Sequence, residues 1–108
     1  GANPNTLLSD GMSVLHYAAT DSDSFWIEKA LAAKGDPNLV NANASQAKRG
    51  SVMWYAIGGR QIDNVKILLD KGADLNAYIH HQYTALSYAL HRPDFDTALY
   101  LLQKKQTI

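Results

Sequence analysis

The chain has 108 residues, with ten basic and ten acidic side chains and no cysteine. Zero net charge without a basic stripe argues against nucleic acid as the main partner, because nucleic-acid binding depends on neutralising phosphates. The lack of cysteine excludes a disulfide framework and a thiol nucleophile, and no apolar run approaches the ~18 residues of a membrane-spanning helix. We therefore expect a single domain that does not insert this segment into a membrane.

The sequence repeats itself along its whole length. One short segment occurs three times, as Gly1–Asn5, Lys34–Asn38 and Gly72–Asn76. The residues after Ser13 align with those after Ser51 at an offset of 38, and those after Ser51 align with those after Thr84 at an offset of 33. The five additional residues fall between Asn38 and Ser51, which predicts a lengthened loop in the middle unit. A fixed period near 33 residues predicts a stack of supersecondary units.

Each unit contains two predicted helices. Ser13, Ser51 and Thr84 stand where the first helices begin, and a hydroxyl there can cap an unpaired backbone N–H group. The first helices then place apolar residues at three- and four-residue spacing: Leu15, Ala18, Ala19; Met53, Ala56, Ile57; and Leu86, Ala89, Leu90. The second helices do the same: Ile27, Ala30, Leu31; Val65, Leu68, Leu69; and Ala98, Leu101, Leu102. We expect Gly72 to end the second helix of the middle unit in a left-handed cap.

These residues resemble the ankyrin repeat, most clearly in Gly11–Ala19 and Val65–Asn76. The resemblance implies an all-α ankyrin-repeat solenoid of three helix-turn-helix units with hairpin loops. It implies a single domain over residues 1–108, with units at about 1–33, 34–71 and 72–108. The chain departs from the family pattern where Val14, Val52 and Ala85 replace a proline and Lys34 replaces a glycine. Because the first residues match those that follow the second helix of a unit, we expect the chain to be part of a longer array.

No acid, base and nucleophile occur together in a catalytic pattern, so we expect no enzyme activity, no cofactor and no metal. His80 and His81 are adjacent, and in an extended hairpin their rings should point apart. A contact surface is the favoured role for this pair, and metal binding is the alternative. His16 occupies the position of the family's histidine, which implies that it ties one unit to the next. Gly58-Gly59-Arg60 lacks the ending of a phosphate-binding loop and is expected to form a turn.

The resemblance also implies that a partner protein binds to a concave surface made by the hairpin tips and the first helices. Transferred position by position, the loop residues of this surface are Leu7, Ser9, Asp10, Met12, Lys48, Arg49, Tyr78, His80, His81 and Tyr83. The ends of the first helices add Thr20, Asp21, Gly59, Arg60, His91 and Arg92. Tyr17, Tyr55 and Tyr88 occupy one equivalent position in the three units, where they pack between units, contact a partner, or do both.

Two longer stretches, Gly1–Ala19 and Lys71–Leu90, resemble ankyrin-type immunity proteins of enterobacteria, which neutralise lipase toxins delivered by type VI secretion. This resemblance implies a bacterial immunity or inhibitor protein that occludes a lipase effector in the periplasm or cell envelope. A cytoplasmic location is the alternative. The lipidated cysteine usual in that group is absent from this chain, so the resemblance implies that the chain is a fragment from the C-terminal part of such a protein. The alternative functions are a scaffold or adaptor for another protein and self-assembly through open repeat ends.

Overall fold

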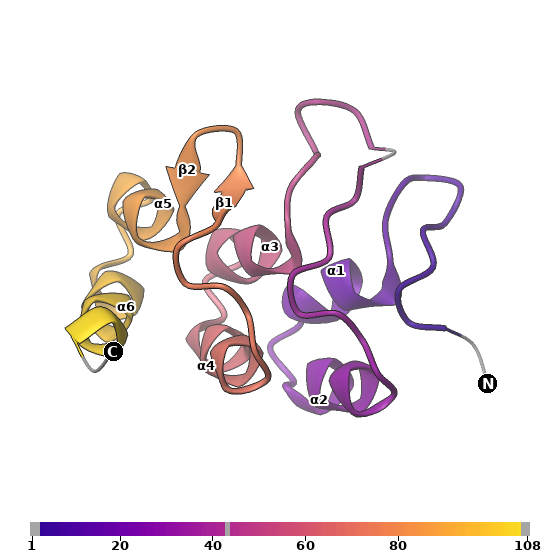
Figure 1. The fold of residues 1–108 in the computed structure, drawn as a ribbon, viewed down its shortest axis with the longest axis horizontal. Helices are drawn as coiled ribbons and strands as arrows, with labels where there is room; N and C mark the ends of the chain where they lie inside the picture. The colour runs from indigo at the N-terminus through magenta and orange to yellow at the C-terminus, as the bar shows by residue number, and fades with distance from the viewer. Residues whose placement is uncertain (1–2, 43, 107–108) are drawn as a thin grey trace.

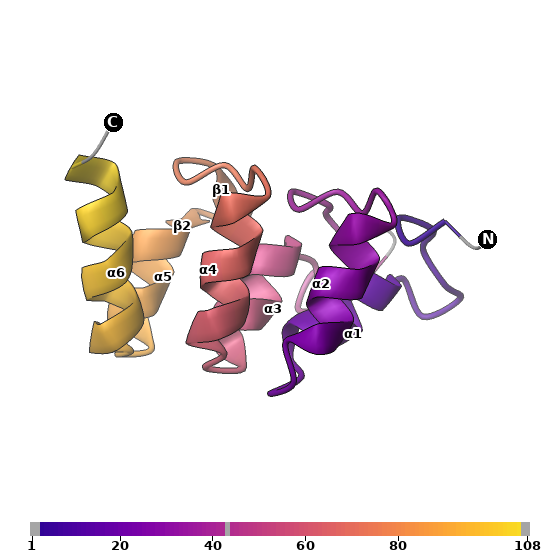
Figure 2. The same cartoon turned by 90° about the horizontal axis from the view of Figure 1, so that it is seen from below.

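The chain folds into three stacked pairs of antiparallel helices. The computed structural model describes residues 3–42 and 44–106. The elements within these residues are α1 (Val14–Ala19), α2 (Phe25–Ala32), α3 (Val52–Gly58), α4 (Ile62–Asp70), β1 (Tyr78–His80), β2 (Tyr83–Thr84), α5 (Ala85–His91) and α6 (Phe95–Gln106). Figure 1 shows α1, α3 and α5 in one row with α2 and α4 beneath them, and Figure 2 shows α2, α4 and α6 side by side. The predicted all-α solenoid is confirmed.

The three predicted helix starts are confirmed by their capping geometry. The Ser13 hydroxyl accepts a hydrogen bond from the His16 backbone N–H at 3.3 Å, and Thr84 accepts one from Ser87 at the same distance. Ser51 accepts one from the Trp54 backbone N–H at 3.4 Å. Each cap satisfies a backbone donor that has no partner within its helix.

A continuous apolar core joins the units. It contains most of the predicted apolar positions, and its fully buried large side chains include Leu15, Ile27, Ile57, Val65, Leu68 and Leu101. Two predicted core residues are exposed instead: Leu90 by 51% and Leu102 by 44%. The reason is their orientation, because α5 and α6 pack against α3 and α4 with their opposite faces. Together with Leu86, Phe95, Ala98 and Leu99, they line a depression of about 400 Å³, which we call the apolar end patch.

The recurring asparagine of each unit ties neighbouring turns together. Asn5 accepts a hydrogen bond from the Asp36 N–H at 2.6 Å and donates to the Lys34 carbonyl at 3.1 Å. Asn38 repeats the arrangement one unit later, with the Asp74 N–H at 2.7 Å and the Gly72 carbonyl at 3.2 Å. The repeated segment therefore carries a side-chain ladder that fixes the spacing of the units. Gly1 and Ala2 of its first copy lie outside the described residues.

The turns that end the second helices need a left-handed residue. Gly72 has φ +103°, as expected for a helix cap. Lys34 takes the same role with φ +73° although it has a side chain. A non-glycine residue is disfavoured in this region, so the turn of the first unit carries backbone strain that the middle unit avoids.

Candidate functional site

Three loops project from the same side of the helical stack (Figure 1). They precede α1, α3 and α5 and comprise residues 6–12, 39–50 and 77–83. We call these loops, together with the adjoining exposed parts and C-terminal ends of α1, α3 and α5, the loop-side surface. The structure thus brings together segments that are about one repeat apart in the sequence.

Most of the predicted contact residues are accessible on this surface. The exposed ones are Ser9, Asp10, Tyr17, Thr20, Asp21, Lys48, Arg49, Gly59, Arg60, Tyr78, His81 and His91. The half-buried ones are Leu7, Tyr55, His80, Tyr83, Tyr88 and Arg92. Met12 is wrongly included in the predicted set, because it is only 9% exposed and its sulfur receives the Asn41 side-chain N–H at 3.2 Å. It supports the loop from below.

Two of the three equivalent tyrosines, Tyr17 and Tyr55, form hydrogen bonds to the loops of their own units. The Tyr17 hydroxyl donates to the Asp10 carboxylate, and the Tyr55 hydroxyl donates to the Lys48 carbonyl at 2.5 Å. The Tyr17 hydrogen bond lowers the pKa of the Asp10 carboxyl, and the same bond raises the pKa of the Tyr17 phenol. Burial raises the pKa of Tyr55. The tyrosine rings therefore hold the loops against the first helices while part of each ring stays accessible.

Asn41 organises the lengthened loop of the middle unit. This fully buried side chain donates to the Lys48 carbonyl at 2.9 Å and to the Tyr55 hydroxyl at 3.0 Å. Its own oxygen accepts the Gly50 N–H at 2.7 Å. Sequence reasoning missed Asn41, although an amide near the start of a lengthened loop is a group able to satisfy several backbone atoms at once. Asn41 therefore holds Lys48 and Gly50, near the end of the loop, close to its start and to α3.

An aromatic cluster joins the middle and third units. The His80 ring stacks on Trp54, with centroids 3.8 Å apart and an interplanar angle of 5°. The centroid of the Tyr88 ring lies 6.1 Å from that of Trp54 and 5.5 Å from that of Tyr83. Tyr83 in turn lies 5.1 Å from His91. Aromatic side chains and histidines from β1, β2, α3 and α5 thus form one continuous patch.

The expectation that the His80 and His81 rings point apart is wrong. Their centroids are 4.0 Å apart in an edge-on contact. His81 has φ +51°, and the pairing of β1 with β2 is irregular between Tyr78 and His80. The alternation of an extended strand is therefore broken at the point where it would separate the two rings.

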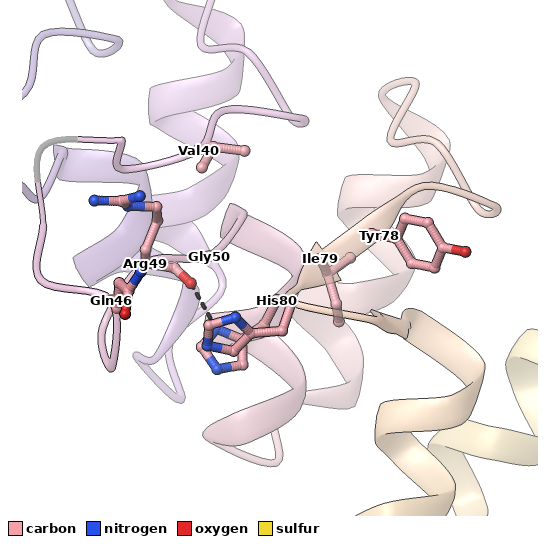
Figure 3. A pocket seen from close by; sticks show the side chains of 8 residues that line it. Val40, Gln46, Arg49, Gly50, Tyr78, Ile79 and His80 are labelled. Atoms are coloured by element: carbon pink, nitrogen blue, oxygen red, sulfur yellow. Dashed lines mark hydrogen bonds between the residues drawn. The ribbon is translucent and has the colours of Figure 1, made fainter.

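A pocket of about 210 Å³ separates the middle loop from the third-unit hairpin (Figure 3). The Arg49 carbonyl accepts a hydrogen bond from His80 Nδ1 at 2.5 Å, and this hydrogen bond joins the two loops at one side of the pocket. The remaining lining residues are Val40, Gln46, Gly50, Tyr78, Ile79 and His81. Figure 3 shows Tyr78 at the edge of the pocket, directed away from Arg49. Two loops from different units therefore act as the walls of one recess.

His16 has the structural role that the resemblance implies. Its ring shares hydrogen bonds with the Ser13 hydroxyl at 2.7 Å and with the Gly50 carbonyl of the next unit at 3.2 Å. Burial lowers the pKa of this histidine. The ring is fully buried, so it takes part in holding the units together and does not reach the loop-side surface.

Charge is distributed unequally between the two sides of the stack. Residues 6–21, 39–60 and 77–92 contain Lys48, Arg49, Arg60 and Arg92 but only two acidic residues, Asp10 and Asp21. All three arginines, all four histidines and five of the six tyrosines lie in these segments. The rest of the chain, which contains the second helices, has eight acidic residues and six lysines. The loop-side surface is therefore positive although the whole chain is neutral.

The described residues contain no group of three or more His, Cys, Asp or Glu side chains placed to hold a metal ion. Within residues 3–42 and 44–106, no helix has the length and apolar character needed to span a bilayer. The turn expected at Gly58-Gly59-Arg60 is formed by Gly59 and Arg60, with Arg60 at φ +59°, whereas Gly58 is the last residue of α3.

Comparison with known proteins supports the architecture. The family model for ankyrin repeats, three copies, matches residues 15–108. No curated protein matches the sequence. The ankyrin repeat is a non-catalytic fold for protein–protein interaction, and partner binding by such solenoids uses the extended surface that the repeats create. Since the match extends over most of the chain and agrees with the stacked helix pairs, this protein belongs to the ankyrin-repeat family.

Proposed function

We propose that this chain binds another protein through the loop-side surface. The observation that carries the proposal is the concentration of Tyr, His and Arg on that side of the molecule. Aromatic residues and arginine are enriched in protein interfaces, whereas lysine and the acidic residues are depleted. The hydrogen bonds of Tyr17, Asn41 and Tyr55 to the loops further support the proposal, because groups held in place before binding lower the entropy cost of binding.

The test is a binding comparison between two variants of the full chain. In the first, the exposed residues Tyr78, His81 and His91 are changed together to Ala. In the matched control, Lys29, Asp63 and Asp70 of the second helices, which are also exposed, are changed to Ala. We expect the first variant to bind the partner about tenfold or more weakly and the control to bind normally. Loss of binding only in the control would contradict the proposal.

The most specific form of this proposal is a bacterial immunity protein that occludes a lipase-type toxin. It is supported by the resemblance of Gly1–Ala19 and Lys71–Leu90 to immunity proteins of that kind. A positive, aromatic surface suits this role, since aromatic anchors provide affinity and charged rims accelerate association. A periplasmic or cell-envelope location belongs to the same proposal, and a cytoplasmic location is the alternative.

The toxin proposal is tested with a purified lipase encoded beside the gene for this chain. We expect stoichiometric addition of the chain to abolish hydrolysis of a chromogenic ester. The variant with Tyr78, His81 and His91 changed to Ala should restore the hydrolysis, while the second-helix control should inhibit as well as the parent. An unchanged hydrolysis rate at saturating chain would rule out this toxin and leave the general binding proposal in place.

A second candidate function is self-association, favoured by the apolar end patch. Phe95 and Leu99 in this patch are 67% and 57% exposed. Exposed apolar patches of this kind mark interfaces. Light scattering over a concentration series distinguishes the candidates. If the chain self-associates through this patch, the average molar mass should rise with concentration in the parent chain and stay constant in Leu99→Lys. A constant monomer mass favours the heterologous partner.

A further inference from the structure

The middle unit has two glycines where its neighbours have side chains. Gly58 and Gly59 close α3, and the equivalent residues are Thr20-Asp21 in the first unit and His91-Arg92 in the third. Glycine in a helix is less favourable than alanine, because it loses more backbone entropy on folding. A glycine at position 58 therefore needs a local explanation.

Neither the backbone nor the packing requires glycine at position 58. Among the described glycines, only Gly11 and Gly72 have positive φ. A Cβ atom on Gly58 would meet only the Tyr88 hydroxyl, at an ordinary contact distance of 3.6 Å. The missing side chain instead leaves a recess of about 250 Å³, which we call the notch, lined by Thr20, Trp54, Tyr55, Gly58, Gly59 and Tyr88.

The notch has the size and walls of a receptor for one apolar side chain. The Trp54 ring meets Tyr55 at an angle of 78° and Tyr88 at 54°, so these rings border the recess with both edges and faces. A cavity on the order of 150 Å³ holds a benzene-sized group, whereas sites for drug-sized ligands usually start near about 300 Å³. The notch therefore fits a Phe or Leu side chain better than a free cofactor.

Two guanidinium groups lie next to the notch, although neither is part of its lining. Arg92 Nη2 donates to the Gly58 carbonyl at 2.7 Å, and Arg60 Nη2 donates to the Arg92 carbonyl at 3.1 Å. Neither arginine has a carboxylate partner within the described part of the chain. The carboxylate of Asp94 is instead bonded to the backbone and hydroxyl of Thr97. Guanidinium groups bind carboxylates strongly and with two-point geometry, so acidic groups complement this edge.

We propose that the notch receives an apolar side chain from an acidic segment of the partner, with flanking carboxylates on Arg60 and Arg92. This inference rests on the proposed function and names the chemistry of the partner at one point of the loop-side surface. The aromatic walls also attract cations, but the two arginines repel a cationic segment. Charge thus selects the acidic occupant.

Three short peptides test the chemistry directly on the full chain. The first is Ac-Glu-Glu-Gly-Phe-Gly-Glu-Glu-NH2, the second replaces every Glu with Lys, and the third replaces Phe with Ser. We expect the first peptide alone to shift the backbone amide resonances of Gly58 and Gly59 and the indole resonance of Trp54. Its affinity should fall as salt is raised from about 50 to about 200 mM, as expected for charge pairing. Equal or stronger binding of the Lys peptide would overturn the proposal.

Variants of the notch provide the second test. Gly58→Ala should lower the affinity for the first peptide about threefold. Gly58→Leu should lower this affinity more than about tenfold, because the leucine side chain fills the notch. Ala32→Leu adds similar bulk to the exposed end of α2 and is the matched control, with no expected change. The double variant with Arg60→Gln and Arg92→Gln should have at least about fivefold lower affinity for the first peptide, and its helical circular dichroism should be unchanged.

The failure of this inference can be separated from the failure of the proposed function. If a partner protein binds in a manner that depends on Tyr78, His81 and His91 but is unaffected by Gly58→Leu, only the notch proposal is wrong. If binding survives all of these changes, the loop-side surface itself is wrong. Unchanged peptide affinity in Gly58→Leu, whose folding is checked by its unfolding midpoint, also rejects the notch.

Discussion

At the scale of single residues, the lengthened loop depends on one buried amide. Asn41→Ala removes the donors to the Lys48 carbonyl and the Tyr55 hydroxyl and the acceptor for the Gly50 N–H. Because buried groups lose their partners and a small cavity forms, we expect the free energy of unfolding to fall by about 2–4 kcal/mol. Urea denaturation measures the change. Asn38→Ala is the control. Because the hydrogen bonds it removes are exposed to solvent, we expect the free energy of unfolding to fall by no more than about 1 kcal/mol.

His16 predicts a pH dependence of stability. Burial lowers its pKa in the folded chain below the ordinary value of about 6.5. Between the two pKa values the unfolded chain binds a proton that the folded chain does not, so stability falls as the pH drops below about 6.5. We expect a lower urea midpoint at about pH 5 than at about pH 7.5, and a smaller difference in His16→Gln. A midpoint that rises on acidification in the parent would contradict this assignment.

At the scale of elements, one substitution in α3, Gly58→Ala, is expected to stabilise the folded chain. Gly58→Ala adds a methyl group in ordinary contact with the Tyr88 hydroxyl at 3.6 Å, and alanine is the better helix former. We expect the free energy of unfolding to rise by up to about 1 kcal/mol. Gly59→Ala is the comparison. Its Cβ would lie 3.3 Å from the Tyr55 carbonyl oxygen, so we expect this variant to gain less stability than Gly58→Ala or to lose stability. Thermal unfolding of both variants decides the point.

The helices could be predicted from the sequence, but the shape of the loops could not. Ser13 and Ser51 caps and the apolar spacing are local signals, so the positions of the helix pairs follow from residues a few positions apart. His80 and Asn41 depend instead on contacts with Arg49, Trp54 and Tyr55, which no local pattern encodes. The left-handed conformation of His81 reversed the predicted separation of the histidine rings. The burial of Met12 likewise follows from the folded loop above it.

At the scale of the whole molecule, the two sides of the stack have different chemistry. The Asn5 and Asn38 ladder and the buried seam hold the units in register. The loop-side surface then collects positive and aromatic groups from three units, while the remaining segments, which are the second helices and the turns around them, hold eight of the ten acidic residues. An acidic partner is therefore drawn to one side of a neutral molecule, and raised salt should slow its association.

The linear arrangement also predicts unequal stability along the chain. In such arrays each unit is stabilised by its own folding and by the interfaces with its neighbours. The middle unit has two such interfaces, since α3 contacts both α1 and α5, whereas α1 and α5 contact only one neighbouring first helix. Amide hydrogen exchange followed by mass spectrometry should therefore be slowest in α3 and α4 and faster in α1 and α6. Val65→Ala in the shared core should accelerate exchange in all units, because the end units lose their support. Uniform exchange along the parent chain would instead mean that the three units unfold as one cooperative block.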